Sequence, residues 1–328
     1  MSSPAATRTD VRFSSGGVDC AGWFFAPAAD SPFAGPAGVP VVVMAHGFGG
    51  TMDSGLQPYA EHLAAAGLAV LTFDYRHFGH SGGQPRQQVS MAGQQQDYLA
   101  AIAAAVDQPG VDPDRVVLWG VSLSGGHVLN VAGRHARRDE RAAGEIAAVI
   151  AMVPLVSGLA AGRHNYPQAG AAGMLRATAR GIGSSLGARL GREPMLMPLV
   201  GEPGEPAALT ADGYAQAYRA VAGPTWRNEV DAAVGLELGG YRADKNAAHI
   251  EAPVLVQIAD YDRAAPPHAA AKAAFAARAE VRHYPCDHFD VYPGARFHGR
   301  VTKDQIAFLQ RILAPRSGPR AAAGAIRQ

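Results

Sequence analysis

Ser122 lies in the segment with the strongest chemical signal, residues 119–126, which read WGVSLSGG. The segment follows an apolar run and begins a stretch of helical character, so Ser122 falls on a predicted sharp turn between a strand and a helix. Such a turn holds a serine hydroxyl clear of the backbone and requires small residues two positions away on each side. The helix N-terminus also offers unpaired N–H groups and positive partial charge to a developing anion. We therefore predict that Ser122 is a nucleophile.

Ser124 occupies the position where a second glycine normally completes the G-x-S-x-G pattern of such a turn. This departure is small, because serine adds only a hydroxymethyl group, but it leaves Ser124 open as an alternative nucleophile. Ser124 would lie half a turn into the helix and has Ser122, not glycine, two residues before it. Ser122 is the preferred assignment.

The chain resembles the α/β-hydrolase superfamily from about residue 39 to residue 313. The resemblance rests on the WGVSLSGG segment and on residues 46–50 (HGFGG), which follow the apolar run VVVMA. It implies that the backbone N–H groups of Phe48 and Leu123 bind the oxyanion of the reaction. Residues 74–82 (DYRHFGHSG) resemble a further family loop, in which we expect Asp74 and Arg76 to pair.

In this family the catalytic acid and base follow the nucleophile in the order Asp, His. Asp262 matches the acid position after the apolar run PVLVQI, and Asp260 is the alternative. His288 matches the base position in the loop after the last predicted strand. His283 is a weaker candidate, because it falls inside that strand, where we expect its ring to point into the sheet packing. The resemblance thus implies a triad of Ser122, Asp262 and His288.

Apolar runs and helical stretches alternate along most of the chain, which predicts an α/β class with a doubly wound, mostly parallel sheet. With the resemblance, this becomes an α/β-hydrolase fold with a helical cap insertion. A hairpin over residues 11–26 precedes the alternation. The predicted strands are Val39–Ala45, Leu68–Phe73, Arg115–Val121, Ile146–Val153, Pro253–Ile258 and Val281–Tyr284, and the predicted helices are Leu56–Ala66, Ala92–Val106, Leu123–Arg137, Pro267–Arg278 and Val301–Leu313.

The alternation stops between Leu155 and Ala248, where we find no convincing strand. A structureless loop of this length is unusual in a compact domain, so we predict a helical cap insertion over residues 155–248. Residues 1–154 then form the first part of the core and residues 249–314 the second part. Residues 315–328 are predicted to be a flexible tail.

Composition limits the possible partners and compartment. The chain has 29 Lys and Arg against 28 Asp and Glu, a formal net charge of +1, which argues against a nucleic-acid partner. No stretch approaches about 18 uninterrupted apolar residues, so we expect no membrane span. The first ten residues lack the apolar core of a signal peptide and the two cysteines cannot form a disulfide framework, so we expect a cytoplasmic protein. The oligomeric state stays open, a homodimer being one alternative.

The predicted chemistry is hydrolysis of a small-molecule carboxylic ester through an acyl-enzyme, which requires no metal and no organic cofactor. Two alternatives use the same triad, namely an acyltransferase or thioesterase of a biosynthetic pathway and a peptidase of X-Pro type. A binding protein without activity would need a broken triad. Few positive charges lie near the motifs beyond Arg76, Arg86 and Arg263, so the sequence favours medium-chain or aromatic acyl esters over anionic substrates.

Overall fold

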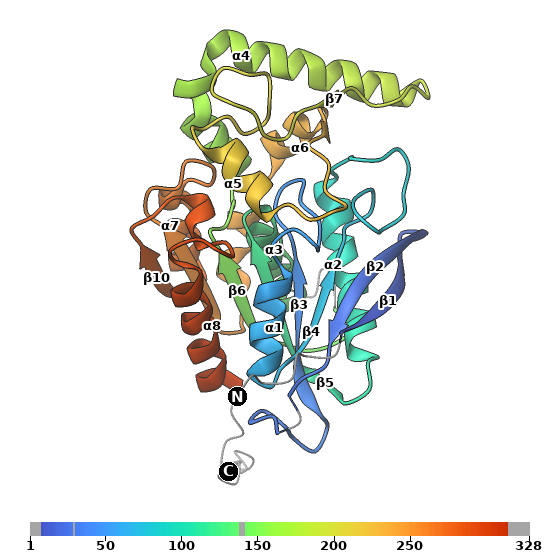
Figure 1. Ribbon diagram of the computed structural model, residues 1–328, viewed down its shortest axis with the longest axis vertical. Coiled ribbons are helices and arrows are strands. Elements are labelled where there is room, and N and C mark those ends of the chain that lie inside the picture. Colours follow the sequence, from blue (N-terminus) through green and yellow to red (C-terminus); the bar gives the residue numbers. More distant parts are fainter. Residues whose placement is uncertain (1–7, 29, 138–141, 314–328) are drawn as a thin grey trace, which may run out of the picture.

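Eight strands form one sheet in the computed structural model, which describes residues 8–28, 30–137 and 142–313 (Figure 1). The strand order is β1-β2-β4-β3-β5-β6-β9-β10. β1 and β2 pair antiparallel with their neighbours, and the remaining pairs are parallel. The predicted α/β class and mostly parallel sheet are confirmed. The bounds are β1 (Arg8–Ser15), β2 (Val18–Phe25), β3 (Val39–Ala45), β4 (Ala69–Phe73), β5 (Val111–Val121), β6 (Ile146–Met152), β9 (Val254–Ala259) and β10 (Glu280–Tyr284).

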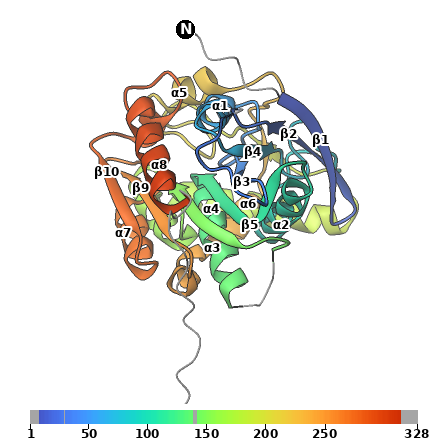
Figure 2. The same cartoon turned by 90° about the horizontal axis from the view of Figure 1, so that it is seen from below.

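Helices cover both faces of the sheet, as its central strands require. Every residue of β3, β4 and β9 is buried, so neither face of these strands contacts water. Helices α1 and α8 lie on one face, and α2, α3 and α7 lie on the other (Figure 2). The bounds are α1 (Gln57–Ala65), α2 (Met91–Val106), α3 (Leu123–Ala136), α7 (Pro267–Ala276) and α8 (His298–Leu313). No helix in the described part of the chain is both long and apolar enough to cross a membrane.

The segment between β6 and β9 is mostly helical and lies at one end of the sheet (Figure 1). Our expectation that it holds no strand is wrong, because β7 and β8 pair antiparallel, Leu196 with Asp231 and Met197 with Val230. Strands of two residues are too short to show an alternating pattern. The helices and strands here are α4 (Gly158–Arg189), β7 (Leu196–Met197), α5 (Tyr214–Val221), β8 (Val230–Asp231) and α6 (Val234–Gly240), followed by the 3₁₀ helices η1 (Ala243–Lys245) and η2 (Ala247–His249).

The boundaries of the cap insertion, residues 155–248, stay a prediction. The predicted tail, residues 315–328, lies outside the described residues.

Four of the parallel strands end immediately before the segments that contain the candidate site residues. β3 leads to residues 46–50, β5 to Ser122, β9 to the loop with Asp262, and β10 to the loop with His288. Because the carboxyl ends of parallel neighbours share one edge of a sheet, these segments meet there.

Candidate active site

Ser122 connects β5 to α3 in a strained turn. Its φ of 57° and ψ of −119° lie in a region that residues with a side chain rarely adopt. The turn is held by the neighbouring strand, since the Ser122 amide donates to the Met152 carbonyl at 2.9 Å and the Ser122 carbonyl accepts from the Leu155 amide at 2.9 Å. A Cβ atom at Gly120 would lie 2.2 Å from the carbonyl oxygen of Ser124, so only glycine fits there. The predicted sharp strand-to-helix turn is therefore present.

Ser124 points into the protein and not into the cavity beside Ser122. Its side chain is fully buried, and its hydroxyl donates to the backbone carbonyl of His46 at 2.7 Å. The same hydroxyl is hydrogen-bonded to the phenol of Tyr75. Ser124 is also absent from the residues that line the cavity. These contacts support Ser122 over Ser124 as the nucleophile.

Asp262 and His288 form a buried hydrogen-bonded pair. The Nδ1 atom of His288 lies 2.7 Å from Oδ2 of Asp262, and both side chains are almost inaccessible to solvent. The Oδ1 atom of Asp262 accepts from the amides of Ala264 at 2.8 Å and Ala265 at 2.6 Å, which fixes the carboxylate. Burial alone would lower the pKa of His288, but the charge of Asp262 and its hydrogen bond outweigh burial and raise the pKa above its usual value. The pair therefore has the geometry of a base with its orienting acid.

Asp287 holds the loop that carries His288, and the sequence analysis missed it. Its Oδ1 atom accepts from the amide of His288 at 2.7 Å and from the hydroxyl of Tyr214 at 2.8 Å. The guanidinium of Arg263 lies 2.6 Å from Oδ2. Burial would raise the pKa of Asp287, but the donated hydrogen bonds and Arg263 lower it, so the carboxyl ionises readily. The sequence contained one signal for the role of Asp287, namely an acidic residue directly before the predicted base His288.

The two rejected candidates pair with each other away from this site. The Nδ1 atom of His283 lies 2.6 Å from Oδ1 of Asp260, and the side chain of His283 is 54% exposed. Our expectation that His283 points into the sheet packing is wrong, because β10 is the edge strand and its other face is open to solvent. Asp260 and His283 therefore do not contribute to the pair at Asp262.

Two backbone amides beside Ser122 are free to bind an anion. Among the described residues, neither the Phe48 nor the Leu123 amide donates a hydrogen bond to another group. A Cβ atom at Gly47 would lie 2.9 Å from the Cβ atom of Ser122, so glycine allows the loop after β3 to pack directly on the turn. This arrangement supports the predicted oxyanion site.

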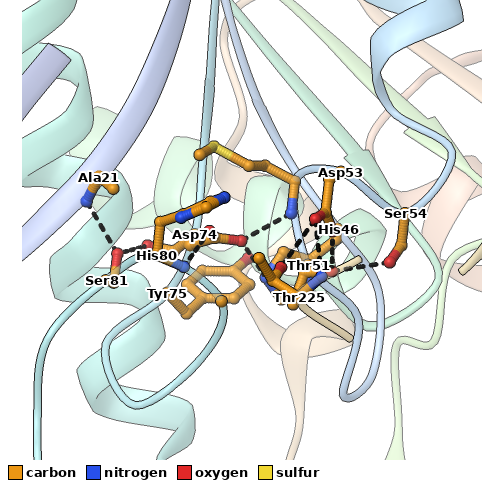
Figure 3. A network of polar contacts seen from close by, with 12 residues as sticks. Ala21, His46, Thr51, Asp53, Ser54, Asp74, Tyr75, His80, Ser81 and Thr225 are labelled. Carbon is orange, nitrogen blue, oxygen red and sulfur yellow. Dashed lines mark hydrogen bonds and ion pairs between the residues drawn. The ribbon is translucent and has the colours of Figure 1, made fainter. Parts of the chain in front are cut away.

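Asp74 anchors the loop after β3 from one side (Figure 3). Its Oδ1 atom accepts from the Met52 amide at 2.6 Å, and Oδ2 accepts from the His80 amide at 2.8 Å. Burial raises the pKa of Asp74 from 3.8 to about 7, although the two amides oppose this. The segment between β6 and β9 also anchors this loop, since the hydroxyl of Thr225 donates to Asp53 at 2.8 Å (Figure 3). The loop is thus fixed on both sides.

The predicted pairing of Asp74 with Arg76 is wrong. Arg76 reaches across to α2, where Nη2 lies 2.7 Å from Oδ1 of the fully buried Asp97. Asp74 instead faces the two amides and the imidazole of His46, whose Nε2 lies 4.0 Å away. Burial lowers the pKa of His46 to about 4, so this ring is neutral near pH 7 and braces the loop.

A cavity of about 840 Å³ lies between the sheet edge and the insertion. Ser122 and His288 both line it, although no hydrogen bond joins their side chains in the described part of the chain. Such contacts often tighten only when substrate binds. Most other lining residues are apolar, among them Phe48, Leu155, Leu159, Met174, Met197, Leu209, Val234, Leu238, Phe289 and Tyr292.

Three arginines of α4 also line this cavity, namely Arg163, Arg176 and Arg180. Our expectation of few positive charges near the site is therefore wrong. It considered only charges close to the motifs in sequence, whereas α4 reaches the site from the insertion. The available signal was the absence of acidic residues from 155 to 192, a stretch that contains five arginines.

A mixed eight-stranded sheet with a serine on a strained turn after its central strand and an Asp–His pair beyond two later strands defines an α/β-hydrolase architecture. Residues 40–295 match the family described as alpha/beta hydrolase fold. The chain belongs to this family.

One curated relative supports this membership, and two solved structures share the fold. The quorum-quenching protein AidA of Acinetobacter baumannii (strain MDR-ZJ06) is 37% identical over 307 residues, which are 93% of this chain and 95% of the relative. The crystal structure of the alpha/beta hydrolase GrgF from Penicillium sp. sh18 matches with a TM-score of 0.72 at 22% identity, covering 94% of this chain and 100% of that one. Est1E from Butyrivibrio proteoclasticus, bound to ferulic acid, has a TM-score of 0.59 at 18% identity and covers 93% and 100%.

Proposed function

We propose that the protein is a serine hydrolase that cleaves a carboxylic ester through an acyl-enzyme. The observation that carries the proposal is the 2.7 Å contact between His288 and Asp262, with His288 lining the same cavity as the strained Ser122. The largely apolar lining of the cavity supports an acyl group as the part of the substrate that it binds.

The first half-reaction forms the acyl-enzyme. The Oγ atom of Ser122 attacks the ester carbonyl carbon while Nε2 of His288 takes the hydroxyl proton. The amides of Phe48 and Leu123 stabilise the oxyanion, and such donors contribute about 3 kcal/mol each in comparable sites. The tetrahedral intermediate then collapses, the ester C–O bond breaks, and His288 returns the proton to the leaving alcohol. Asp262 keeps the imidazole oriented and stabilises its protonated form.

The second half-reaction is hydrolysis. A water molecule attacks the acyl carbon as His288 accepts one of its protons, and the same two amides stabilise the second oxyanion. Collapse breaks the bond to Ser122, which recovers a proton from His288, and the carboxylic acid leaves. All proton transfers pass through one imidazole, so the cycle needs no other titrating group.

The proposal is tested with p-nitrophenyl esters of increasing acyl length and with a fluorophosphonate probe whose adduct is mapped by mass spectrometry. Ser122→Ala is expected to lose at least 10⁴-fold in kcat and to lose the adduct. Ser124→Ala is the matched control, and it is expected to keep the adduct on Ser122. An adduct on Ser124 in the wild-type protein would show that Ser122 is not the nucleophile. A wild-type protein that forms no adduct and turns over no ester would refute the proposed function.

Acyl transfer is a second candidate, favoured by one relative. The polyketide transferase grgF of Penicillium sp is 29% identical over 205 residues, which are 62% of this chain and 61% of the relative. In this reaction an alcohol or amine replaces water in the second half-reaction. Product analysis with an added alcohol distinguishes the two, since transfer yields a new ester and hydrolysis yields only the acid. An X-Pro amide in the same assay tests the peptidase alternative, which no observation here favours over the ester.

The Acinetobacter relative suggests one specific substrate class to test. Because it is described as a quorum-quenching protein, we include a quorum-sensing signal among the substrates of the assay. Loss of signal activity in the presence of the wild-type protein, and not of Ser122→Ala, is the expected result.

A further inference from the structure

One face of α4 places two arginines in the wall of the cavity. Gly173, Arg176, Ala177 and Arg180 all line the cavity, and their spacing of i, i+3, i+4 and i+7 puts them on one side of the helix. Because Gly173 and Ala177 have no side chain or a small one, this face of the helix leaves space for the side chains of Arg176 and Arg180. Both arginines therefore belong to the lining of the cavity, and both are also exposed to solvent.

A break in α4 brings a third arginine to the same cavity. Gly170 has φ 64° and ψ 170°, which are not helical values, so α4 changes direction there. The first segment contributes Leu159, Gly162 and Arg163 to the lining, and the second contributes Arg176 and Arg180. Three arginines from two helical segments thus line one cavity.

Within residues 8–28, 30–137 and 142–313, no acidic side chain pairs with these three arginines. No ion pair or hydrogen bond joins the guanidinium of Arg163, Arg176 or Arg180 to any residue that the structure describes. Glu205 is the one acidic residue in the described lining of the cavity, and its Oε2 already accepts from the amide of Glu202 at 2.8 Å. Like charges that share a partly apolar space repel one another, and an anion between them removes the repulsion.

A second pocket extends the positive region beyond the cavity. It has a volume of about 480 Å³ and shares Leu159 and Arg163 with the cavity. Lys272 and His268 of α7 also line it. Its acidic lining residue, Asp244, is already bound by Arg242 at 2.9 Å through two parallel contacts. Arg163 and Lys272 therefore place positive charge in this pocket as well.

We propose that the acyl substrate of Ser122 carries an anionic group, a carboxylate or a phosphate, which Arg163, Arg176 and Arg180 bind. This rests on the proposed ester or thioester chemistry and names its substrate class. The planar guanidinium group donates two parallel hydrogen bonds to either anion, which suits both oxyacids. The apolar remainder of the cavity binds the chain between the anion and the reacting carbonyl. Charge, and not chain length alone, then selects the substrate.

Two matched substrate pairs test the proposal and distinguish the source of the anion. The first pair is the p-nitrophenyl ester of adipic acid with its second carboxyl free, against the same compound with that carboxyl methylated. The second pair is an octanoyl thioester of pantetheine 4′-phosphate, against the thioester of pantetheine. The measured quantity is the ratio of kcat/KM for the charged and uncharged member. A preference in the first pair assigns a carboxylate, and one in the second assigns a phosphate.

The arginine variants decide whether the preference arises at α4. Arg163→Gln, Arg176→Gln and Arg180→Gln are each expected to lower the ratio about threefold to tenfold, because kcat/KM of the charged member falls more than that of the uncharged member. Arg189→Gln is the control, because Arg189 is on the same helix but does not line the cavity. Raising the salt concentration is expected to lower the wild-type ratio. A ratio near one in both pairs, or equal losses for charged and uncharged members, would overturn the proposal.

Failure of the proposed function is detected separately. Binding of the p-nitrophenyl monoester of adipic acid and of pantetheine 4′-phosphate to Ser122→Ala, measured by calorimetry, does not depend on turnover. Arginine-dependent binding without turnover in the wild-type protein would refute the hydrolase proposal alone. Turnover of uncharged esters without arginine-dependent binding of either anion would refute the anion site alone.

Discussion

The hydroxyl of Ser124 donates a hydrogen bond to the backbone carbonyl of His46 at 2.7 Å. Ser124 is the second residue of α3, and His46 directly follows β3. The bond therefore links the helix behind the predicted nucleophile to the loop that carries the amide of Phe48. Where other members of the superfamily place glycine, this chain has a side chain that links the two parts of the proposed oxyanion site.

Ser124→Ala is expected to weaken that link without removing the nucleophile. The carbonyl of His46 and the phenol of Tyr75 lose a buried partner, so the free energy of unfolding should fall by about 1–3 kcal/mol. Looser placement of the Phe48 amide should lower kcat about tenfold with little change in KM. Urea unfolding and steady-state kinetics measure the two effects. Unchanged kcat in a destabilised variant would show that the link has no role in catalysis.

The acid side of the pH profile should report His288. Only the neutral imidazole accepts the proton of Ser122, so kcat/KM should rise with pH through the pKa of His288 and then level off. Because this pKa is raised, the midpoint should lie above the ordinary value of 6.5. Asp287→Asn removes a charge that helps to raise it and should move the midpoint to lower pH. Asp260→Asn is the control, since Asp260 pairs with His283, and a midpoint that moves equally in both variants would contradict the assignment.

Asp74 should make stability depend on pH. Its folded-state pKa of about 7 lies above the ordinary 3.8, so the native state binds the proton more tightly than the unfolded state does. The free energy of unfolding should therefore fall as pH rises from about 4 to about 7, by a few kcal/mol. The side chain of Asn does not titrate in Asp74→Asn. The free energy of unfolding of this variant, relative to that of the wild type, should therefore increase as pH rises from about 4 to about 7. Urea midpoints at pH 4.5, 6 and 7.5 test this, and a constant difference would show that Asp74 is ionised throughout.

Gly120 should tolerate no side chain. A Cβ atom there would lie 2.2 Å from the carbonyl oxygen of Ser124, within backbone that cannot move without reshaping the turn. Gly120→Ala should destabilise the protein by more than about 3 kcal/mol and abolish turnover. Gly299→Ala is the control, because Gly299 is in α8 with no atom within 4 Å of the added Cβ, and its effect should stay within about 1 kcal/mol. Differential scanning calorimetry and p-nitrophenyl ester turnover compare the two.

The sequence predicted the sheet and the meeting of the chemical segments because both depend on local patterns. Continuous apolar runs such as VPVVVMA indicate strands buried on both faces, and their carboxyl ends share one edge. Asp262 and His288 follow two neighbouring strands, and the structure joins them by a hydrogen bond. Their catalytic roles, and that of Ser122, stay predictions.

Features that depend on long-range packing were not predictable in the same way. Arg76 pairs with Asp97, which lies 21 residues further along the chain, because α2 packs beside the loop. The exposure of His283 depends on β10 being the last strand of the sheet, which no pattern within β10 reveals. Arginines from both sides of the direction change at Gly170 line the cavity. Motif spacing contains none of this information.

The break at Gly170 has a consequence for how substrate preference is encoded. The groups proposed to react with the substrate carbonyl come from loops at the sheet edge. Much of the cavity surface available to the remainder of the substrate comes from α4 and α6. We therefore expect reactivity and selectivity to depend on separate stretches of the chain. Exchange of the α4 stretch between family members should transfer preference for one compound over another and leave the chemical step as it was.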